Sequence, residues 1–151
     1  MDEPVADSGS FARIFLAGTI DMGNSVDWQK QTVKWFSSRP GRDSLYKRRR
    51  DDYKNTAEEF DFQVKWELEH LEKSDLVIMN ILGNSQSPVS LLEMGIYMKS
   101  GKLYVACEPD YFRYGNVKIT CRKYGVPLYG SLDSLLNSLP EFAVLLKHPQ
   151  I

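Results

Sequence analysis

The sequence predicts an α/β protein with a three-layer, Rossmann/flavodoxin-like architecture, in which a five-stranded parallel sheet carries helices on both faces. Two observations lead to this class. Short apolar runs bounded by turn residues are typical of buried parallel strands. These runs alternate along the chain with longer segments whose apolar residues recur at helical spacing. Right-handed crossovers between the strands are consistent with such a sheet. We favour the flavodoxin-like strand order 2-1-3-4-5, in which the second strand is the least defined.

Length and composition are those of one globular domain. The chain has 151 residues, of which 42% are apolar and 26% charged, with a net charge of −1. We expect a disordered tail over residues 1–10 and a single domain over residues 11–151. A nearly neutral chain without a long apolar run indicates neither nucleic-acid nor membrane binding. No signal peptide and no metal-ligand spacing of Cys or His are visible, which predicts a cytoplasmic location, reduced thiols and no metal.

The first strand is expected over residues 12–18, the apolar segment ARIFLAG. A loop of small and polar residues follows over 18–25, and in α/β proteins this loop approaches the ligand. It lacks the GxGxxG fingerprint of dinucleotide binding. The next helix is capped by Asp27 or Ser25 and draws its apolar residues from Trp28, Val33, Trp35 and Phe36. For Trp28, a place in the core is favoured over a platform for base stacking.

The segment from residue 39 to residue 54 contains seven Lys or Arg and three Asp. We interpret it as a solvated loop. The alternative is an anion-binding lid, because an Arg side chain can form two parallel hydrogen bonds to phosphate oxygens. The following helix begins with a capping box, Thr56-x-x-Glu59. Its apolar stripe is predicted to pack on the sheet and consists of Phe60, Val64, Leu68 and Leu71. A second row on a neighbouring face consists of Gln63, Glu67 and His70.

The central part of the chain is the stretch from residue 74 to residue 101. A buried strand over 76–82 leads into the turn GNSQSP and then a helix with Ser87 as N-cap. The apolar face of that helix is predicted to be Val89, Leu92, Ile96 and Tyr97. Glu93 lies one turn into the helix, close to the carboxyl end of a parallel strand, where open α/β sheets bind ligands.

The remaining elements follow in order. A strand is expected over 102–109, a short helix over 117–124 and a strand over 126–131. The last helix carries Leu132, Leu135, Leu136 and Leu139 on one face, and apolar residues after Pro140 either prolong it or contact a neighbouring subunit.

Several of these segments resemble the nucleoside 2-deoxyribosyltransferase-like proteins. They are FLAGTI, the QxxWE pattern of Gln63, Trp66 and Glu67, SDLVIMNI, and LLEMGIYMKSGKLYVACEP, and the similarity covers residues 13–136. The resemblance implies that Glu93 is the nucleophile, because a carboxylate can capture the oxocarbenium-like C1′ formed when an N-glycosidic bond breaks. It implies that Asp75 assists the departing base. No cofactor is implied.

The resemblance also suggests the substrate. Transferases of the family carry an acid shortly before the nucleophile, where this chain has Ser87 and Pro88. The chain is similar in this respect to the branch that hydrolyses deoxynucleoside 5′-monophosphates, where a serine holds the phosphate. Ser87 and Ser90 lie near a helix N-terminus, which favours anions. The other residues assigned to substrate binding are Gly18, Thr19, Ile20, Asp21, Gln63 and Glu67.

The leading hypothesis is therefore an enzyme that cleaves the N-glycosidic bond of a nucleoside or nucleotide and transfers the sugar to another base or to water. The alternatives are a 5′-monophosphate N-hydrolase and, from another class, a non-catalytic nucleotide sensor. An electron carrier or phospho-receiver fits the fold but not the motifs. Simpler roles remain open: Glu93 as a solvated carboxylate and Asp75 as a residue that caps a backbone amide. The expected partners are a small nucleoside or nucleotide and a second copy in a homodimer or larger homo-oligomer.

Overall fold

The computed structural model describes residues 13–20, 27–38, 44–47 and 56–147. For residues 44–47 and 140–147 it describes the backbone alone. Its sheet is parallel throughout and has the order β2-β1-β3-β4-β5. The strands are β1 (Arg13–Gly18), β2 (Ser44–Lys47), β3 (Leu76–Ile81), β4 (Leu103–Cys107) and β5 (Leu128–Tyr129). Four strands have four or more residues, while β5 has only two, Leu128–Tyr129. The predicted α/β class and strand order are confirmed, but the fifth strand is much shorter than the predicted 126–131.

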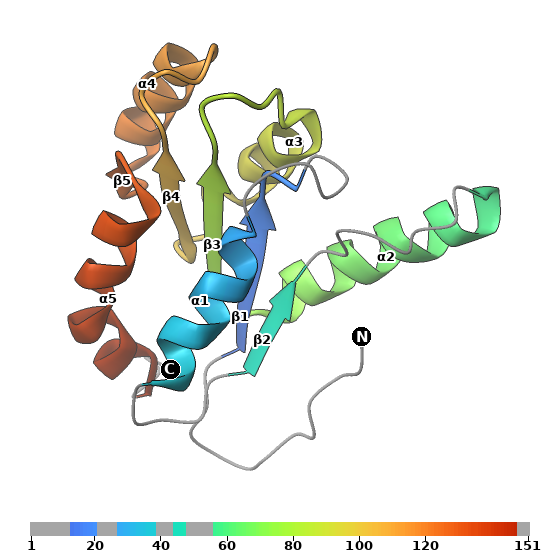
Figure 1. The fold of residues 1–151 in the computed structure, drawn as a ribbon, viewed down its shortest axis with the longest axis horizontal. Helices are drawn as coiled ribbons and strands as arrows, with labels where there is room; N and C mark the ends of the chain where they lie inside the picture. The colour runs from blue at the N-terminus through green and yellow to red at the C-terminus, as the bar shows by residue number, and fades with distance from the viewer. Residues whose placement is uncertain (1–12, 21–26, 39–43, 48–55, 148–151) are drawn as a thin grey trace.

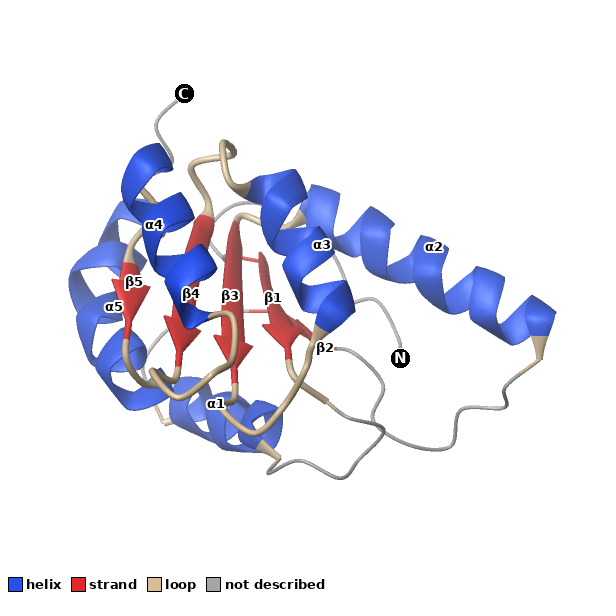
Figure 2. Cartoon of the chain, turned by 90° about the horizontal axis from the view of Figure 1, so that it is seen from above, coloured by secondary structure: helices blue, strands red, loops and turns tan. Residues whose placement is uncertain are grey.

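Helices cover both faces of this sheet, as Figures 1 and 2 show. One face is covered by α2 (Ala57–Lys73), α3 (Pro88–Tyr97) and α4 (Tyr114–Tyr124), and the other by α1 (Trp28–Ser37) and α5 (Leu132–Lys147). Side chains alternate along each strand, so β1 sends Phe15 and Ala17 to the first layer and Ile14 and Leu16 to the second. Every residue of β3 is buried, as expected for a central parallel strand.

Two predictions about the first half of the chain are wrong. The basic segment 39–54 was interpreted as a loop, yet its residues 44–47 form β2, which pairs with β1. The buried face of α1 includes the polar Gln29 and Thr32, whereas Val33, expected in the core, is 37% exposed. Trp28 is buried at 1%, which confirms its expected place in the core. The predicted tail 1–10 and the binding residue Asp21 lie outside the described residues.

The ends of the helices follow the expected local chemistry. Asp27 Oδ1 accepts a hydrogen bond from Lys30 N at 3.1 Å, and Thr56 Oγ1 accepts one from Glu59 N at 3.1 Å, so each caps its helix. The carboxyl end of α2 is closed by the Nζ of Lys102, which donates to the carbonyl of Leu71 at 2.6 Å. Burial lowers the pKa of Lys102, although the nearby acids oppose that shift.

The largest departure from prediction concerns which faces of α2 and α3 are buried. On α2 the predicted apolar stripe is mostly exposed, and the buried side chains are Gln63, Glu67, His70 and Leu71. On α3 the expected apolar face is exposed except for Tyr97, and the buried side chains are Ser90, Glu93, Met94 and Tyr97. Both helices therefore bury polar groups beside Leu71, Met94 and Tyr97 of the core, while most of the predicted apolar stripe faces outward.

Within the described residues, no helix is both long enough and apolar enough to pass through a lipid bilayer. The cytoplasmic location remains a prediction.

Candidate functional site

Three buried hydroxyl groups meet where β1 and β3 end. Thr19 follows β1, and Ser85 and Ser87 follow β3, its neighbour in the sheet. The Oγ1 of Thr19 lies 3.0 Å from Ser85 Oγ and 2.6 Å from Ser87 Oγ, and the two serine oxygens are 2.8 Å apart. None of the three residues is more than 7% exposed. We refer to them as the hydroxyl cluster.

The backbone around Thr19 is held on both sides. Thr19 N–H donates to Asn80 O at 2.9 Å, and its carbonyl accepts from Trp28 Nε1 at 2.7 Å. Gly18 has a φ of +127°, and a Cβ at that position would overlap the backbone of Asn80. Glycine is therefore required for β1 to approach β3 this closely. Gly18, Thr19 and Trp28 thus form one positioned loop, and Ile20 follows half-buried.

Ser87 occupies the N-cap position of α3, as predicted, but its hydroxyl does not cap the helix. Its backbone is left-handed, with φ 49° and ψ 51°, a conformation that among the described residues no other non-glycine adopts. Such a conformation costs of order 1–3 kcal/mol, and it is maintained only when the surroundings enforce it. It turns the Ser87 hydroxyl into the cluster instead of along the helix axis.

The turn between β3 and α3 is held in place by the segment after β4. Tyr111 is buried, and its hydroxyl donates to Gln86 O at 2.6 Å. Glu108 Oε1 accepts from Gly83 N at 2.6 Å. Sequence reasoning missed Ser85, Glu108 and Tyr111 as site residues. The signal that could have found Glu108 is its position at the carboxyl end of a strand that neighbours β3.

Glu93 lies on the buried face of α3, less than two turns from Ser87. It is 3% exposed, and Ser90, one turn before it on the same face, is 2% exposed. The alternative of a solvated helix carboxylate is therefore wrong. Tyr97, one turn further, donates its hydroxyl to Glu72 Oε2 at 3.1 Å, which ties α3 to α2. Burial, together with Glu72 and Glu93, raises the pKa of Tyr97 to about 12.

Gln63 and Glu67 lie on the face of α2 that turns toward the sheet, each 7% exposed. Gln63 Nε2 donates to Glu67 Oε1 at 3.2 Å. Within the described part of the chain, the Oε1 of Gln63 is buried and accepts no hydrogen bond. A buried acceptor without a partner is unusual and marks a place where a ligand donor would be favoured.

Asp75, which was expected to assist the departing base, lies away from this site. It precedes β3, so it lies at the amino edge of the sheet, about 20 Å from the turn at the other end of the strand. Its Oδ2 accepts from Arg13 N at 2.8 Å, and its own N–H donates to Arg13 O at 2.7 Å. Asp75 is thus the amide-capping junction residue that was the alternative interpretation.

No group of three potential metal ligands occurs among the described residues. His70 is buried, stacks on Trp66 with ring centroids 4.0 Å apart, and its Nδ1 lies 2.8 Å from Trp66 O. It therefore packs within α2. The alternative interpretation of residues 39–54 as an anion-binding lid lies outside the described residues apart from the backbone of β2.

The arrangement can supply two kinds of chemistry. The hydroxyl cluster and the free N–H groups at the amino end of α3 suit an anion or a set of sugar hydroxyls. A carboxylate one to two turns further along the helix, shielded from water, suits attack on an electrophilic carbon.

Comparison with known proteins gives one result about the family. Residues 12–111, two thirds of the chain, match the family model described as "Nucleoside 2-deoxyribosyltransferase like". The match covers the hydroxyl cluster, Gln63, Glu67 and Glu93. A search among curated proteins finds no match to this chain.

Proposed function

Because this chain belongs to the nucleoside 2-deoxyribosyltransferase-like family, we propose that it is an enzyme that cleaves the N-glycosidic bond of a nucleoside or nucleotide, with Glu93 as the nucleophile. The observation that carries the proposal is the position of Glu93. It is a buried carboxylate on the inner face of α3, close to the hydroxyl cluster at the carboxyl edge of the sheet.

The proposed reaction uses Glu93 covalently. Its carboxylate oxygen forms a bond to C1′ while the C1′–N bond breaks, and the bonding electrons leave with the base, which takes up a proton. Water or a second base then attacks C1′, gives up one proton, which balances the proton taken up by the departing base, and releases Glu93 as a carboxylate. Burial supports this step because a carboxylate in a dry site is stabilised by the developing positive charge more strongly than in water. Asp75 has no part in this scheme.

Binding residues are assigned from their hydrogen-bonding capacity. The Oε1 of Gln63, which has no partner among the described residues, can accept from a substrate hydroxyl or amine while its amide holds Glu67. The hydroxyls of Thr19, Ser87 and Ser90 can donate to oxygens of the sugar or of a substituent at its 5′ position.

A second candidate is hydrolysis of a deoxynucleoside 5′-monophosphate. The hydroxyl cluster favours it, since three hydroxyls beside a helix N-terminus are well suited to a phosphate. A charge-assisted hydrogen bond contributes about 1.5–3 kcal/mol, so the loss of one would lower kcat/KM by roughly 10- to 100-fold.

The activity is tested by incubating the protein with a panel of deoxynucleosides and their 5′-monophosphates, with and without a free acceptor base. Released bases and new nucleosides are separated by chromatography. We expect Glu93→Gln to abolish base release, while the matched control Glu69→Gln, an exposed acid paired with Lys73, keeps it. A 2′-fluoro substrate should leave its sugar on Glu93, detected by mass spectrometry. Wild-type turnover by the Glu93 variant would refute the proposal, and binding without turnover by the native protein would favour the sensor.

Phosphate recognition is tested by comparing kcat/KM for a nucleoside with that for its monophosphate. We expect the monophosphate to be preferred and Ser87→Ala to remove that preference. Ser100→Ala is the control, because the Ser100 hydroxyl donates to Tyr97 O and accepts from Lys102 N after the end of α3, away from the hydroxyl cluster. If both substrates have the same kcat/KM and Ser87→Ala changes neither value, there is no phosphate site. The proposal of a transferase that acts on nucleosides would then be favoured.

A further inference from the structure

Lys102 joins the ends of several elements at the amino edge of the sheet. It directly precedes β4, and its Nζ donates to the carbonyls of Leu71 at 2.6 Å, Glu72 at 3.1 Å and Ser74 at 2.9 Å. An ammonium group has three N–H donors, so these bonds use all of them. Two of the acceptors belong to the last turn of α2, whose carbonyls lack the regular helical partner. Lys102 therefore holds the carboxyl end of α2 beside the start of β4.

The same ammonium group also contacts α3. Its Nζ lies 5.0 Å from the centroid of the Tyr97 ring, a distance at which a cation is attracted to an aromatic face. The hydroxyl of Tyr97 in turn donates to Glu72 Oε2 at 3.1 Å. These contacts form a closed circuit from Lys102 to the end of α2, through Glu72 to Tyr97, and back to Lys102. We call Lys102, Glu72 and Tyr97 the clamp.

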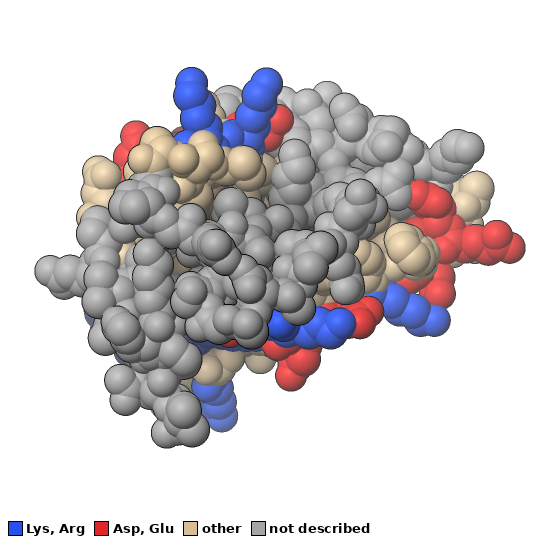
Figure 3. Space-filling model, turned by 90° about the horizontal axis from the view of Figure 1, so that it is seen from below, with Lys and Arg blue, Asp and Glu red and all other residues tan. Residues whose placement is uncertain are grey.

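Electrostatics favour a charged amine at this place. Burial lowers the pKa of Lys102, and the carboxylates of Glu72 and Asp75 oppose that shift. Burial and the bond to Glu72 raise the pKa of Tyr97 to about 12, so its hydroxyl remains a donor. Figure 3 shows the molecule from below Figure 1, which is the amino edge, and its acidic side chains gather toward the amino-terminal end of α2. Those acids are at the far end of the helix from the clamp.

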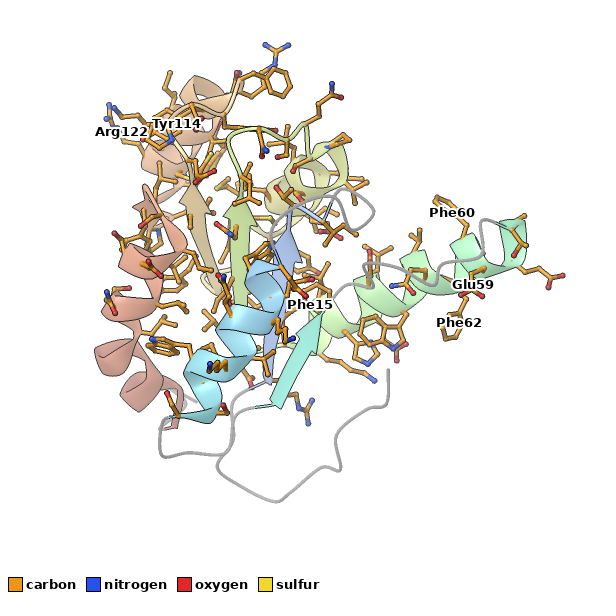
Figure 4. All side chains as sticks on the ribbon, in the orientation of Figure 1. Phe15, Glu59, Phe60, Phe62, Tyr114 and Arg122 are labelled. Atoms are coloured by element: carbon orange, nitrogen blue, oxygen red, sulfur yellow. The ribbon has the colours of Figure 1, made fainter. Side chains whose placement is uncertain are left out.

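The position of α2 depends on its carboxyl-terminal half. Figures 1 and 2 show the amino-terminal part of α2 extending beyond the sheet. In Figure 4, Phe60 and Phe62 project from that extension, far from the core residue Phe15. Contact with the sheet comes later in the helix, where the ring of Trp66 lies 6.3 Å from that of Phe15 and Leu71 is fully buried. The clamp thus acts on the half of α2 that is anchored.

Both clamped helices carry residues of the candidate site close to the clamp. Glu93 lies four residues before Tyr97 and Glu67 lies five residues before Glu72, which are about 6 and 7.5 Å along the respective helix axes. Both carboxylates are on buried faces. Glu93 is near enough to Tyr97 to contribute to its raised pKa. A rotation or shift of either helix at the clamp would therefore move a carboxylate of the site.

We propose that Lys102 is a positioning residue: its ammonium group fixes α2 against α3 and thereby sets the placement of Gln63 and Glu67 relative to Glu93. This inference rests on the function proposed above. Lys102 lies at the opposite edge of the sheet from the hydroxyl cluster, so it acts through the two helices and not on the substrate. A misplacement of reacting groups by about 1 Å can lower a rate by about 100-fold, which makes such a role measurable.

Steady-state kinetics of base release test this role. We expect Lys102→Met to lower kcat by about 10- to 100-fold, while KM changes by less than about threefold because the hydroxyl cluster is undisturbed. Tyr97→Phe loses only the bond to Glu72 and should lower kcat by about 2- to 10-fold. Lys99→Met is the matched control, because Lys99 is exposed and its Nζ also lies over a ring, 5.4 Å from the centroid of Tyr124. It should keep the native kcat, and far-UV circular dichroism should show all three variants to be folded.

A rescue experiment separates the charge of Lys102 from its packing. Alkylation of Lys102→Cys with 2-bromoethylamine restores an ammonium group on a side chain of the original length, whereas 1-iodopropane restores the length without the charge. Burial raises the pKa of Cys107 to about 12 and of Cys121 to about 11, so both should stay unmodified at pH 8, which mass spectrometry verifies. We expect the aminoethyl form to recover kcat and the propyl form to remain slow. Equal recovery in both forms would contradict the role of the ammonium group.

Hydrogen exchange measures the clamp without any need for activity. In Lys102→Met the amides in the last turns of α2 and α3 should exchange about 10-fold faster than in the native protein, and in Lys99→Met they should not. A native protein that releases no base refutes the proposed function, and exchange then decides alone whether Lys102 fixes the two helices. Unchanged exchange in Lys102→Met overturns the inference. So does a native kcat in that variant.

Discussion

Replacing Thr19 by valine keeps the branched shape of the side chain and removes the hydroxyl at the centre of the hydroxyl cluster. The Oγ1 of Thr19 accepts from Leu82 N–H at 3.1 Å and bonds to Ser85 and Ser87 at 3.0 and 2.6 Å. Thr19 is 1% exposed, so water does not replace the lost acceptor. The hydroxyls of Ser85 and Ser87 can still hydrogen-bond to each other at 2.8 Å. The main loss is therefore the acceptor for Leu82 N–H.

A buried donor left without an acceptor costs about 1–3 kcal/mol, so we expect Thr19→Val to lower the free energy of unfolding by about that amount. With a urea slope of about 1–3 kcal/mol per molar, the unfolding midpoint should fall by about 1 M. The measurement is urea unfolding followed by circular dichroism. If the proposed activity is confirmed, kcat/KM of the variant should fall as well, because Ser87 loses its shortest contact.

Thr32→Val is the matched control. Thr32 is also fully buried, but its Oγ1 donates to the carbonyl of Trp28, one turn earlier in α1, at 2.8 Å. That bond supplements the helix, and removing it leaves no N–H unpaired, so we expect a loss below about 1 kcal/mol. Equal losses in the two variants would refute the reasoning that the Leu82 N–H decides the cost.

Three further predictions concern strain, positioning and thiol chemistry. Ser87→Gly should be more stable than Ser87→Ala by about 1 kcal/mol in urea unfolding, because only glycine relieves the left-handed backbone. Tyr111→Phe should lower kcat/KM through the loss of its bond to the turn before α3, whereas Tyr124→Phe, on a half-exposed ring, should not. Burial raises the pKa of Cys107 to about 12 and that of Cys121 to about 11, so neither should react with iodoacetamide at pH 8 until urea unfolds the chain. Both thiols ionise more easily when unfolded, so the free energy of unfolding should fall as the pH rises above the usual value of 9.0, and flat stability from pH 8 to 11 would contradict this.

The sequence was sufficient for the fold class because local patterns encode it. The segments that became β1, β3 and β4 are short apolar runs between turn residues. The N-cap positions of α1, α2 and α3 are occupied by Asp27, Thr56 and Ser87, as the capping and turn residues predict. The strand order was favoured as the flavodoxin-like one, because right-handed crossovers alone are also compatible with other doubly wound orders. The strand β2 was missed because its four residues lie within a basic segment with no apolar run.

The faces of the helices were decided only by the tertiary structure. Helical spacing shows that α2 and α3 each have an apolar side, but spacing does not say what that side packs against. The sequence prediction assumed that the apolar side packs on the sheet. In the structure, the polar residues Gln63, Glu67 and Glu93 lie on the buried side instead. A helix can bury polar residues on its own sheet when they bond to one another or line a site, as Gln63 and Glu67 do.

Some residues of the candidate site were predicted from the sequence and others were not, and the difference has a physical reason. Glu93, Ser87 and Ser90 belong to one helix, so helical geometry alone relates them, and Thr19 follows from the rule that ligands bind at the carboxyl ends of parallel strands. Asp75 was placed wrongly although the same rule puts a residue that precedes a strand at the opposite edge. The bonds from Thr19 to Ser87 and from Tyr111 to Gln86 join residues 68 and 25 positions apart, and the sequence does not reveal which distant side chains meet. Those contacts exist because β1 and β4 both flank β3, an adjacency that forms only when the whole sheet assembles.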